Sequence, residues 1–188
     1  TGGEDTVHFA NEIHRSAERL QSLINDIIKL SELDDSDLKL EFETVDLHEL
    51  GEQCVSSMQM QAEKNEVTLQ LEGTSVPMSG NKTLLEELLF NLCSNAVRYN
   101  KKGGSVTIVT AIENTRPVLI VKDTGIGIPK EQQERVFERF YRVDKSRSKS
   151  TGGTGLGLAI VKHIVAQHDA QISMTSEVGV GTEIKVVF

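Results

Sequence analysis

The first part of the chain repeats its apolar residues at helical spacing. Successive apolar or small positions are separated by four, three, four and three residues, which produces a heptad-like seam. Polar residues such as Asn25 and Asp26 fill the opposite face. The pattern predicts one long helix over residues 7–33, which either caps a domain or is half of a helical bundle. The seam consists of Ile13, Ala17, Leu20, Ile24 and Ile27.

Strand-like and helix-like segments alternate along the rest of the chain. A polar stretch at residues 32–37 predicts a linker before them. Asp46, with Glu49 three residues later, predicts an N-cap for the first of the helices. Helices are predicted over residues 46–65, 81–99, 132–141 and 155–167. Strands are predicted over residues 38–42, 67–71, 106–112, 118–121, 172–175 and 182–187, with a hairpin turn at residues 113–117.

This order of elements predicts an α+β fold. We expect a two-layer α/β sandwich, in which a mixed, mostly antiparallel sheet is covered on one face by about three helices. The long N-terminal helix is an addition to that sandwich.

Composition narrows the choice of partners. The 188 residues include 20 basic and 28 acidic side chains, which gives a formal net charge of −8. An acidic chain is a poor candidate for binding nucleic acid, whose partners are basic. Cys54 and Cys93 fit neither a disulfide framework nor a metal-ligand spacing, so we expect both to pack in the interior. No apolar run approaches the roughly 20 residues that span a bilayer.

Two glycine clusters flank a basic segment in the second half of the chain. The first follows a predicted strand and reads Asp123-Thr124-Gly125-Ile126-Gly127-Ile128-Pro129. The second occupies residues 152–158 and opens an apolar helix. Glycines let the backbone approach phosphate, and a helix N-terminus attracts anions, so this arrangement predicts a nucleotide site under a movable basic lid. The basic residues between the clusters are Arg142, Lys145, Arg147 and Lys149.

The spacing of the glycines excludes the two commonest nucleotide motifs. In a dinucleotide fingerprint that starts at Gly153, the third glycine position falls on Leu158. A Walker loop ends in Gly-Lys-Ser or Gly-Lys-Thr, and neither tripeptide occurs in the chain. An ordinary glycine-rich loop before a helix remains the alternative for the second cluster.

Four polar side chains are candidates for direct contacts to a nucleotide. Asn91 and Asn95 lie four residues apart on one predicted helix, so they share a face, and their amide oxygens suit Mg²⁺ that is also bound by phosphate. Arg98 would face the same way and meet phosphate. The Asp123 carboxylate can accept a hydrogen bond from the exocyclic amine of adenine. The alternatives are two asparagines that hydrogen-bond to loops and an aspartate that caps a turn.

In their order and spacing, these motifs resemble the ATP-binding catalytic domain of sensor histidine kinases. That domain belongs to the ATPase superfamily that also includes gyrase, Hsp90 and MutL, and the resemblance covers residues 38–188. The matching segments are similar to the family's N box (residues 91–99), first glycine box (123–129), F box (137–142), second glycine box (153–158) and closing glycine-threonine element (179–182).

The resemblance implies a role for each matched residue. Asp123 would bind the adenine amine, with Thr182 nearby through water, and Asn95 with Asn91 would hold Mg²⁺ on the phosphates of ATP. In hydrolases such as gyrase a glutamate stands in the place of Asn91 and activates water, so Asn91 favours transfer to a protein. Arg142 would approach the γ-phosphate during transfer. The remaining nucleotide contacts implied are Arg98, Tyr99, Gly125, Gly127, Ile128, Gly153, Gly155, Leu156 and Gly157.

The resemblance also implies a place in a larger protein. Residues 1–34 are similar to the second helix of the dimerisation and phosphotransfer hairpin, and residues 35–188 to the catalytic domain. The implied partners are the first hairpin helix with its acceptor histidine, a response-regulator receiver domain, and a second copy in a full-length homodimer. Because the chain starts at Thr1, we expect a soluble fragment from the cytoplasmic part of a membrane-anchored sensor.

One family motif is missing from the sequence. The acceptor histidine is followed in the family by Glu and by Arg-Thr-Pro-like residues, and neither His8 nor His14 has that context. We therefore expect this chain to bind ATP but to lack the histidine that it phosphorylates. An ATP hydrolase or ATP-gated clamp of the same superfamily, or a dimerising nucleotide-binding module without enzymatic activity, remain alternatives.

Overall fold

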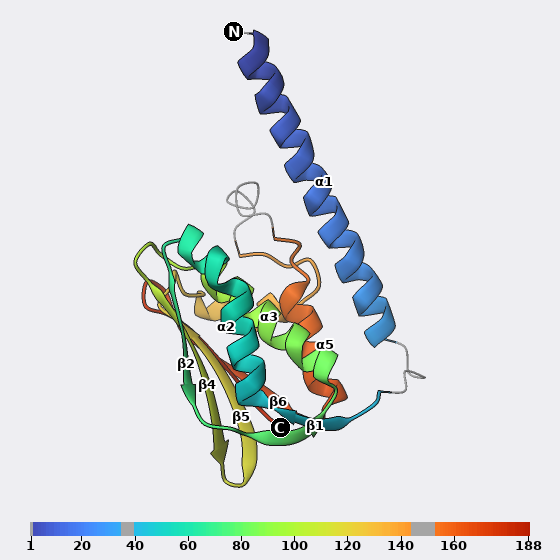
Figure 1. The fold of residues 1–188 in the computed structure, drawn as a ribbon, viewed down its shortest axis with the longest axis vertical. Coiled ribbons are helices and arrows are strands. Elements are labelled where there is room, and N and C mark those ends of the chain that lie inside the picture. The colour runs from blue at the N-terminus through green and yellow to red at the C-terminus, as the bar shows by residue number, and fades with distance from the viewer. Residues whose placement is uncertain (1, 35–39, 144–152) are drawn as a thin grey trace.

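A five-stranded sheet forms one layer of the molecule, and three helices cover one of its faces (Figure 1). The computed structural model describes residues 2–34, 40–143 and 153–188. The covering helices are α2 (Leu47–Lys64), α3 (Lys82–Arg98) and α5 (Gly157–Gln167). The expected α+β sandwich, with a long N-terminal helix α1 (Gly2–Leu33), is thereby confirmed.

The strand order of the main sheet is β2-β4-β5-β7-β6. Only β2 and β4 pair in parallel, and the other neighbours are antiparallel, as expected for a mixed sheet. The predicted hairpin joins β4 to β5 through Asn114 and Thr115, whose φ angles of 49° and 70° suit a two-residue turn. The strands are β2 (Thr68–Gly73), β4 (Ser105–Glu113), β5 (Arg116–Asp123), β6 (Gln171–Glu177) and β7 (Gly181–Val187).

Side-chain caps fix where the two central helices begin. Asp46 Oδ1 accepts a hydrogen bond of 2.8 Å from the backbone N–H of His48 and thereby starts α2. Asn81 Oδ1 does the same for Leu84 in α3, at 3.0 Å. Both cysteines are buried and free, as predicted. The largest fully buried side chains between the layers include Leu85, Leu88, Leu89, Leu92, Ile108, Leu119, Ile160 and Ile164.

Two local predictions were wrong. Residues 132–141 do not form one helix but two 3₁₀ turns, η1 (Lys130–Gln132) and η2 (Arg135–Phe137). A regular helix cannot continue through Phe140, whose φ is +63°. The strand expected over 38–42 is instead β1 (Glu43–Asp46), which pairs with the unpredicted β3 (Pro77–Gly80). The expected linker residues 35–37 lie outside the described residues.

Helix α1 presents two different apolar stripes. The predicted seam is exposed, since Ile13, Leu20 and Ile24 expose 69%, 57% and 49% of their surface. A second stripe near the C-terminal end packs on the sandwich, and Leu30 and Leu33 there are buried. The rest of α1 projects away from the sheet (Figure 1). Among the described helices, none combines the length and the apolar character needed to cross a membrane.

Candidate functional site

A pocket of about 250 Å³ lies where α3, the start of α5 and the ends of β5 and β7 meet. Twelve of the fourteen predicted site residues line it, although they come from five separate parts of the sequence. Gly125 and Leu156 do not. Gly125 packs against the backbone oxygen of Tyr99, and the Leu156 side chain is buried in the core. The twelve are Asn91, Asn95, Arg98, Tyr99, Asp123, Gly127, Ile128, Arg142, Gly153, Gly155, Gly157 and Thr182.

Strand pairing places Asp123 and Thr182 opposite each other at one end of the pocket. The two residues are register partners in β5 and β7. Asp123 Oδ1 accepts hydrogen bonds from the backbone N–H groups of Gly125 (2.8 Å) and Thr182 (3.2 Å). Among the described residues, no group donates to Oδ2, which leaves one acceptor for a ligand.

Burial raises the pKa of the Asp123 carboxyl above its ordinary value. The backbone hydrogen bonds from Gly125 and Thr182 act in the opposite direction and limit that rise. The carboxyl is therefore held in place by two donors but is poorly solvated. A further hydrogen bond from a ligand would stabilise its ionised form.

A network that the sequence did not reveal supports this end of the pocket. Ser176 Oγ accepts from the N–H of Ile128 (2.8 Å) and hydrogen-bonds to Thr182 Oγ1 (2.8 Å). Gln133 Nε2 donates to the backbone oxygens of Ile128 (3.0 Å) and Ser176 (2.8 Å). Gly127 has a φ of +69°, and a Cβ there would lie 2.0 Å from the oxygen of Glu177, so only glycine fits. No spacing rule links these residues, because the sheet brings them together.

Asn91 and Asn95 line the pocket from α3, as their spacing predicted. Asn91 Nδ2 donates to the backbone oxygen of Glu87 (2.9 Å), which turns Oδ1 away from the helix. A Cβ on Gly157 would lie 2.7 Å from Asn91 Oδ1 and 3.8 Å from Asn95 Nδ2. The glycine therefore leaves room in front of two side-chain amides. Amide oxygens are neutral ligands that Mg²⁺ accepts alongside phosphate and water.

Two guanidinium groups meet at Gly153. A Cβ on Gly153 would lie 2.7 Å from Nη1 of Arg98 and 3.7 Å from Nη2 of Arg142, whose Nη1 donates to the Gly153 oxygen. The N–H of Phe140 donates to the oxygen of Gly155 at 2.9 Å and so ties the F-box-like segment to the second glycine cluster. This end of the pocket is suited to anions. The other basic residues of the predicted lid, Lys145, Arg147 and Lys149, lie outside the described residues.

Helix α1 also reaches the pocket, through the polar face that lies opposite the predicted seam. Ser22 and Asp26 line the pocket. Thr154 Oγ1 donates a 2.6 Å hydrogen bond to Asp26 Oδ2. Asp26 lies three residues after Leu23 and four before Leu30, which is helical spacing on the face that packs against the sandwich. The spacing of Leu23 and Leu30 can be read from the sequence, but the surface against which they pack cannot.

Residues 80–188 match the sequence profile described as "Histidine kinase-, DNA gyrase B-, and HSP90-like ATPase". The sensor-like histidine kinase SenX3 of Mycolicibacterium smegmatis is 39% identical over 180 residues, which cover 95% of this chain and 47% of SenX3. The sensor histidine kinase WalK of Bacillus subtilis is 37% identical over 179 residues, covering 94% and 29%. The chain thus spans less than half the length of these relatives.

Solved structures show the same architecture. Full-length ShkA in complex with AMPPNP superposes with a TM-score of 0.83 at 25% identity, covering 97% of this chain and 38% of ShkA. The mycobacterial sensor histidine kinase MprB superposes with a TM-score of 0.68 at 27% identity, covering 79% of this chain and 97% of MprB.

Proposed function

The chain belongs to the histidine kinase-, DNA gyrase B- and HSP90-like ATPase family, and we propose from this that it is the catalytic part of a two-component sensor histidine kinase. In this proposal it binds ATP and transfers the γ-phosphate to a histidine outside residues 1–188. The observation that carries the proposal is the pocket, which joins a half-buried acceptor at one end to amides and guanidinium groups at the other. ATP has the matching order of a donor-bearing base and an anionic chain.

At the base end of the pocket, we assign recognition of adenine to Asp123. Its unused Oδ2 accepts a hydrogen bond from the adenine amine, while Thr182 assists through water. Gly127 and Ile128 form the adjoining surface, held by the Ser176 and Gln133 hydrogen bonds. This arrangement discriminates against a base that presents an acceptor at the same position, because two acceptors would then face each other.

At the other end of the pocket, we assign the phosphate contacts to side-chain amides and guanidinium groups. Asn91 and Asn95 hold Mg²⁺ through their amide oxygens, and the ion neutralises phosphate charge when it is bound. Arg98 and Arg142 neutralise the remaining charge, and Tyr99 lies beside them. Catalysis by these residues consists of positioning and charge stabilisation, as is general for phosphoryl transfer.

The identity of residue 91 supports transfer rather than hydrolysis. A carboxylate at that position would be able to activate water, whereas the Asn91 amide has no basic group. Glu87 lies one turn earlier and forms an ion pair with Lys29 at 3.3 Å, so it is directed toward α1. We therefore rank ATP hydrolysis, or an ATP-gated clamp, below phosphotransfer as the second candidate function.

The exposed seam of α1 supports the proposed partners. Ile13, Leu20 and Ile24 lie at heptad-like spacing and expose 69%, 57% and 49% of their surface, which suits packing against another helix. We assign that place to the first hairpin helix, which carries the acceptor histidine, and to a second copy in the full-length homodimer. A receiver domain then takes the phosphoryl group on its aspartate, and the complete sensor is anchored in a membrane with this part in the cytoplasm.

Phosphotransfer to a supplied acceptor tests the proposal. The chain is incubated with γ-³²P-labelled ATP, Mg²⁺ and a separately produced hairpin segment of the same sensor that carries the acceptor histidine. The expected result is acid-labile, alkali-stable label on the hairpin, and Asn95→Ala removes it by weakening Mg²⁺-dependent binding. Rapid release of labelled phosphate without labelling of the hairpin would support the hydrolase instead. Absence of Mg-ATP binding would support a module without enzymatic activity.

A further inference from the structure

Three side chains at the base end of the pocket form one row across neighbouring strands of the main sheet. Asp123 in β5 is the register partner of Thr182 in β7, and Thr182 is the register partner of Ser176 in β6. Side chains of paired residues lie on the same face of a sheet. Asp123 and Thr182 line the pocket, whereas Ser176 does not, so Ser176 reaches a bound base through Thr182.

The hydroxyl of Ser176 has three polar neighbours. Its Oγ lies 2.8 Å from the backbone nitrogen of Ile128 and 3.0 Å from the backbone oxygen of Gly181. Thr182 Oγ1 is the third neighbour, at 2.8 Å. A serine hydroxyl has one proton to donate and two lone pairs that accept. The Ile128 N–H can only donate and the Gly181 oxygen can only accept, so the first takes one lone pair and the second takes the proton.

These neighbours fix the direction of the hydrogen bond between the two hydroxyls. Ser176 Oγ has one lone pair left, and this lone pair accepts the proton of Thr182 Oγ1. The opposite direction would forfeit the hydrogen bond from Ser176 to Gly181, which costs free energy without a gain elsewhere. Because its proton is used in this way, the Thr182 hydroxyl can only accept hydrogen bonds from the pocket.

The backbone around the hydroxyl pair is held by a glutamine. Gln133 Nε2 donates to the backbone oxygens of Ile128 and Ser176, at 3.0 and 2.8 Å. It thereby ties the loop that contains Ile128 to strand β6 and keeps the Ile128 N–H on the Ser176 oxygen. Gln133 thus holds the loop in position, whereas the Ser176 hydroxyl determines where the Thr182 proton lies.

We propose that Ser176 is a positioning residue for base selectivity, because it fixes Thr182 as an acceptor beside the Asp123 carboxylate. This inference rests on the proposed function, in which adenine binds at this end and Thr182 reaches it through water. A water that donates one proton to Thr182 has its second proton for the base. Adenine N1 accepts that proton, whereas N1 of hypoxanthine or guanine carries a proton of its own. Ser176 therefore adds a second discrimination to the one made by Asp123.

Calorimetric titration with Mg-ATP, Mg-ITP and Mg-1-deaza-ATP tests the proposal. ITP has a protonated N1 and a carbonyl at C6, and 1-deaza-ATP has a C–H in place of N1 but keeps the amine. The unaltered chain should bind 1-deaza-ATP about three- to tenfold more weakly than ATP, the range expected for one hydrogen bond.

Ser176→Ala frees the Thr182 proton to turn toward the pocket. The penalty for 1-deaza-ATP should then fall below about twofold, because the water is no longer oriented toward N1. The ratio of the ITP and ATP dissociation constants should fall about three- to tenfold for the same reason. Ser176→Thr keeps the hydroxyl and should retain the native ratios. Ser173→Ala is the matched control, since Ser173 is an exposed serine on the opposite face of the same strand, and it should change none of the three affinities.

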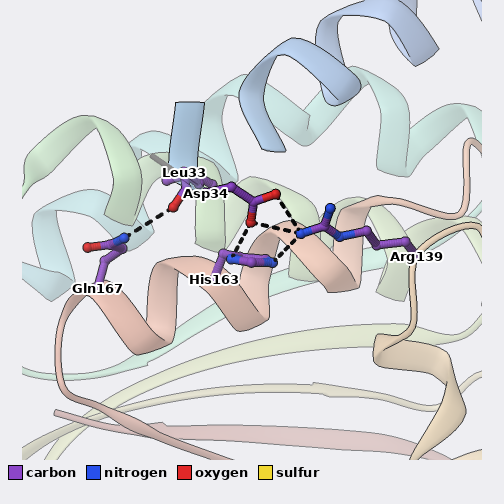
Figure 2. Close-up of polar contacts among 5 residues, drawn as sticks. All are labelled: Leu33, Asp34, Arg139, His163 and Gln167. Atoms are coloured by element: carbon purple, nitrogen blue, oxygen red, sulfur yellow. Dashed lines mark hydrogen bonds and ion pairs between the residues drawn. The ribbon is translucent and has the colours of Figure 1, made fainter. Parts of the chain in front are cut away.

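Gln133→Ala measures the effect of loosening the loop alone. It should weaken binding of ATP and ITP by a common factor and leave their ratio unchanged, because the Ser176 hydroxyl remains. Gln167→Ala is its control, since Gln167 Nε2 also donates to a backbone oxygen, that of Leu33 at 3.2 Å. That hydrogen bond lies outside the pocket lining, in the same group of contacts as the ion pair of Asp34 with Arg139 (Figure 2).

Two results would overturn the proposal. One is a Ser176→Ala chain in which the three affinities are unchanged or are weakened by one common factor, as a purely structural role of the serine would produce. The other is equal binding of ATP and 1-deaza-ATP by the unaltered chain, because N1 would then not be recognised. Failure of the unaltered chain to bind Mg-ATP or to label the hairpin would instead contradict the proposed function.

Discussion

Replacement of Asp123 by Asn separates recognition of the base from maintenance of the fold. In the native chain, Asp123 lines the pocket, and its Oδ1 accepts from the N–H groups of Gly125 and Thr182, whereas no described group donates to Oδ2. The amide oxygen of an asparagine can retain both backbone hydrogen bonds. Its NH₂ group then replaces Oδ2, so a donor meets the amine of adenine where an acceptor stood.

The expected loss of ATP affinity in Asp123→Asn follows from the loss of one charge-assisted hydrogen bond. Such bonds contribute about 1.5–3 kcal/mol, which corresponds to a loss of roughly 10- to 150-fold in ATP affinity. The free energy of unfolding should change by no more than about 1 kcal/mol, because relief of a buried charge offsets the weaker acceptor. The preference for ATP over GTP should shrink, since the asparagine NH₂ can donate to a guanine carbonyl.

Isothermal titration with Mg-ATP and Mg-GTP, together with urea unfolding of the apo chain, measures these quantities. Asp169→Asn is the matched control, because Asp169 lies in the turn after α5, and its φ of 50° is tolerated by asparagine. It should change neither affinity. An Asp123→Asn chain that is folded and binds Mg-ATP as tightly as the native chain would refute the assignment of the base end.

Three further outcomes are expected. Gly157→Ala should weaken Mg-ATP binding at least tenfold in calorimetry, because its Cβ would displace the amide of Asn91, while the melting temperature stays within a few degrees of the native value. Gly51→Ala is the control, because its Cβ meets the side chain of Leu71 at 2.6 Å, so it should alter stability and leave ATP binding unchanged. ATP affinity should fall as pH decreases toward the raised pKa of Asp123, since binding requires the ionised carboxylate, and titrations between pH 8 and pH 5 should show less of this fall in Asp123→Asn. The contribution of the same carboxyl to apo stability has the opposite sign, because its raised pKa favours the folded state at low pH and this is lost as pH rises through that pKa. Asp46→Ala should cost about 1–2 kcal/mol in urea unfolding, because Asp46 caps α2 and also accepts from the N–H of Val76, and a loss below 0.5 kcal/mol would contradict that role.

Local patterns predicted most of the regular elements. The helices that begin after Asp46 and Asn81 start where their cap residues stand, because a cap acts through groups two or three residues away. The β4–β5 hairpin was predictable because its turn is short and its strands alternate. The helix predicted over residues 132–141 was wrong because its conformation depends on a distant contact. Phe140 adopts a left-handed conformation while its N–H donates to the backbone oxygen of Gly155, fifteen residues later.

The residues of the candidate site also fall into those that the sequence predicts and those that only the fold reveals. The chemistry of the sequence alone selected Asp123, the Asn91 and Asn95 pair and the glycine clusters, because acceptor type, helical spacing and close backbone approach are local properties. It did not select Ser176 or Gln133, which support the pocket through strands and loops that meet only in the folded sheet.

The sequence by itself determined that this chain has a long amphipathic helix, an α+β sandwich and the residue types expected of a nucleotide site. Only the tertiary structure decided which face of the long helix packs on the sandwich. Apolar side chains lie on two faces of this helix, and apolar character alone does not specify the surface that buries them. That packing places Asp26, on the face opposite the predicted seam, in the lining of the pocket. A hydrogen bond between residues 128 positions apart is fixed by the docking of whole elements, which no local pattern encodes.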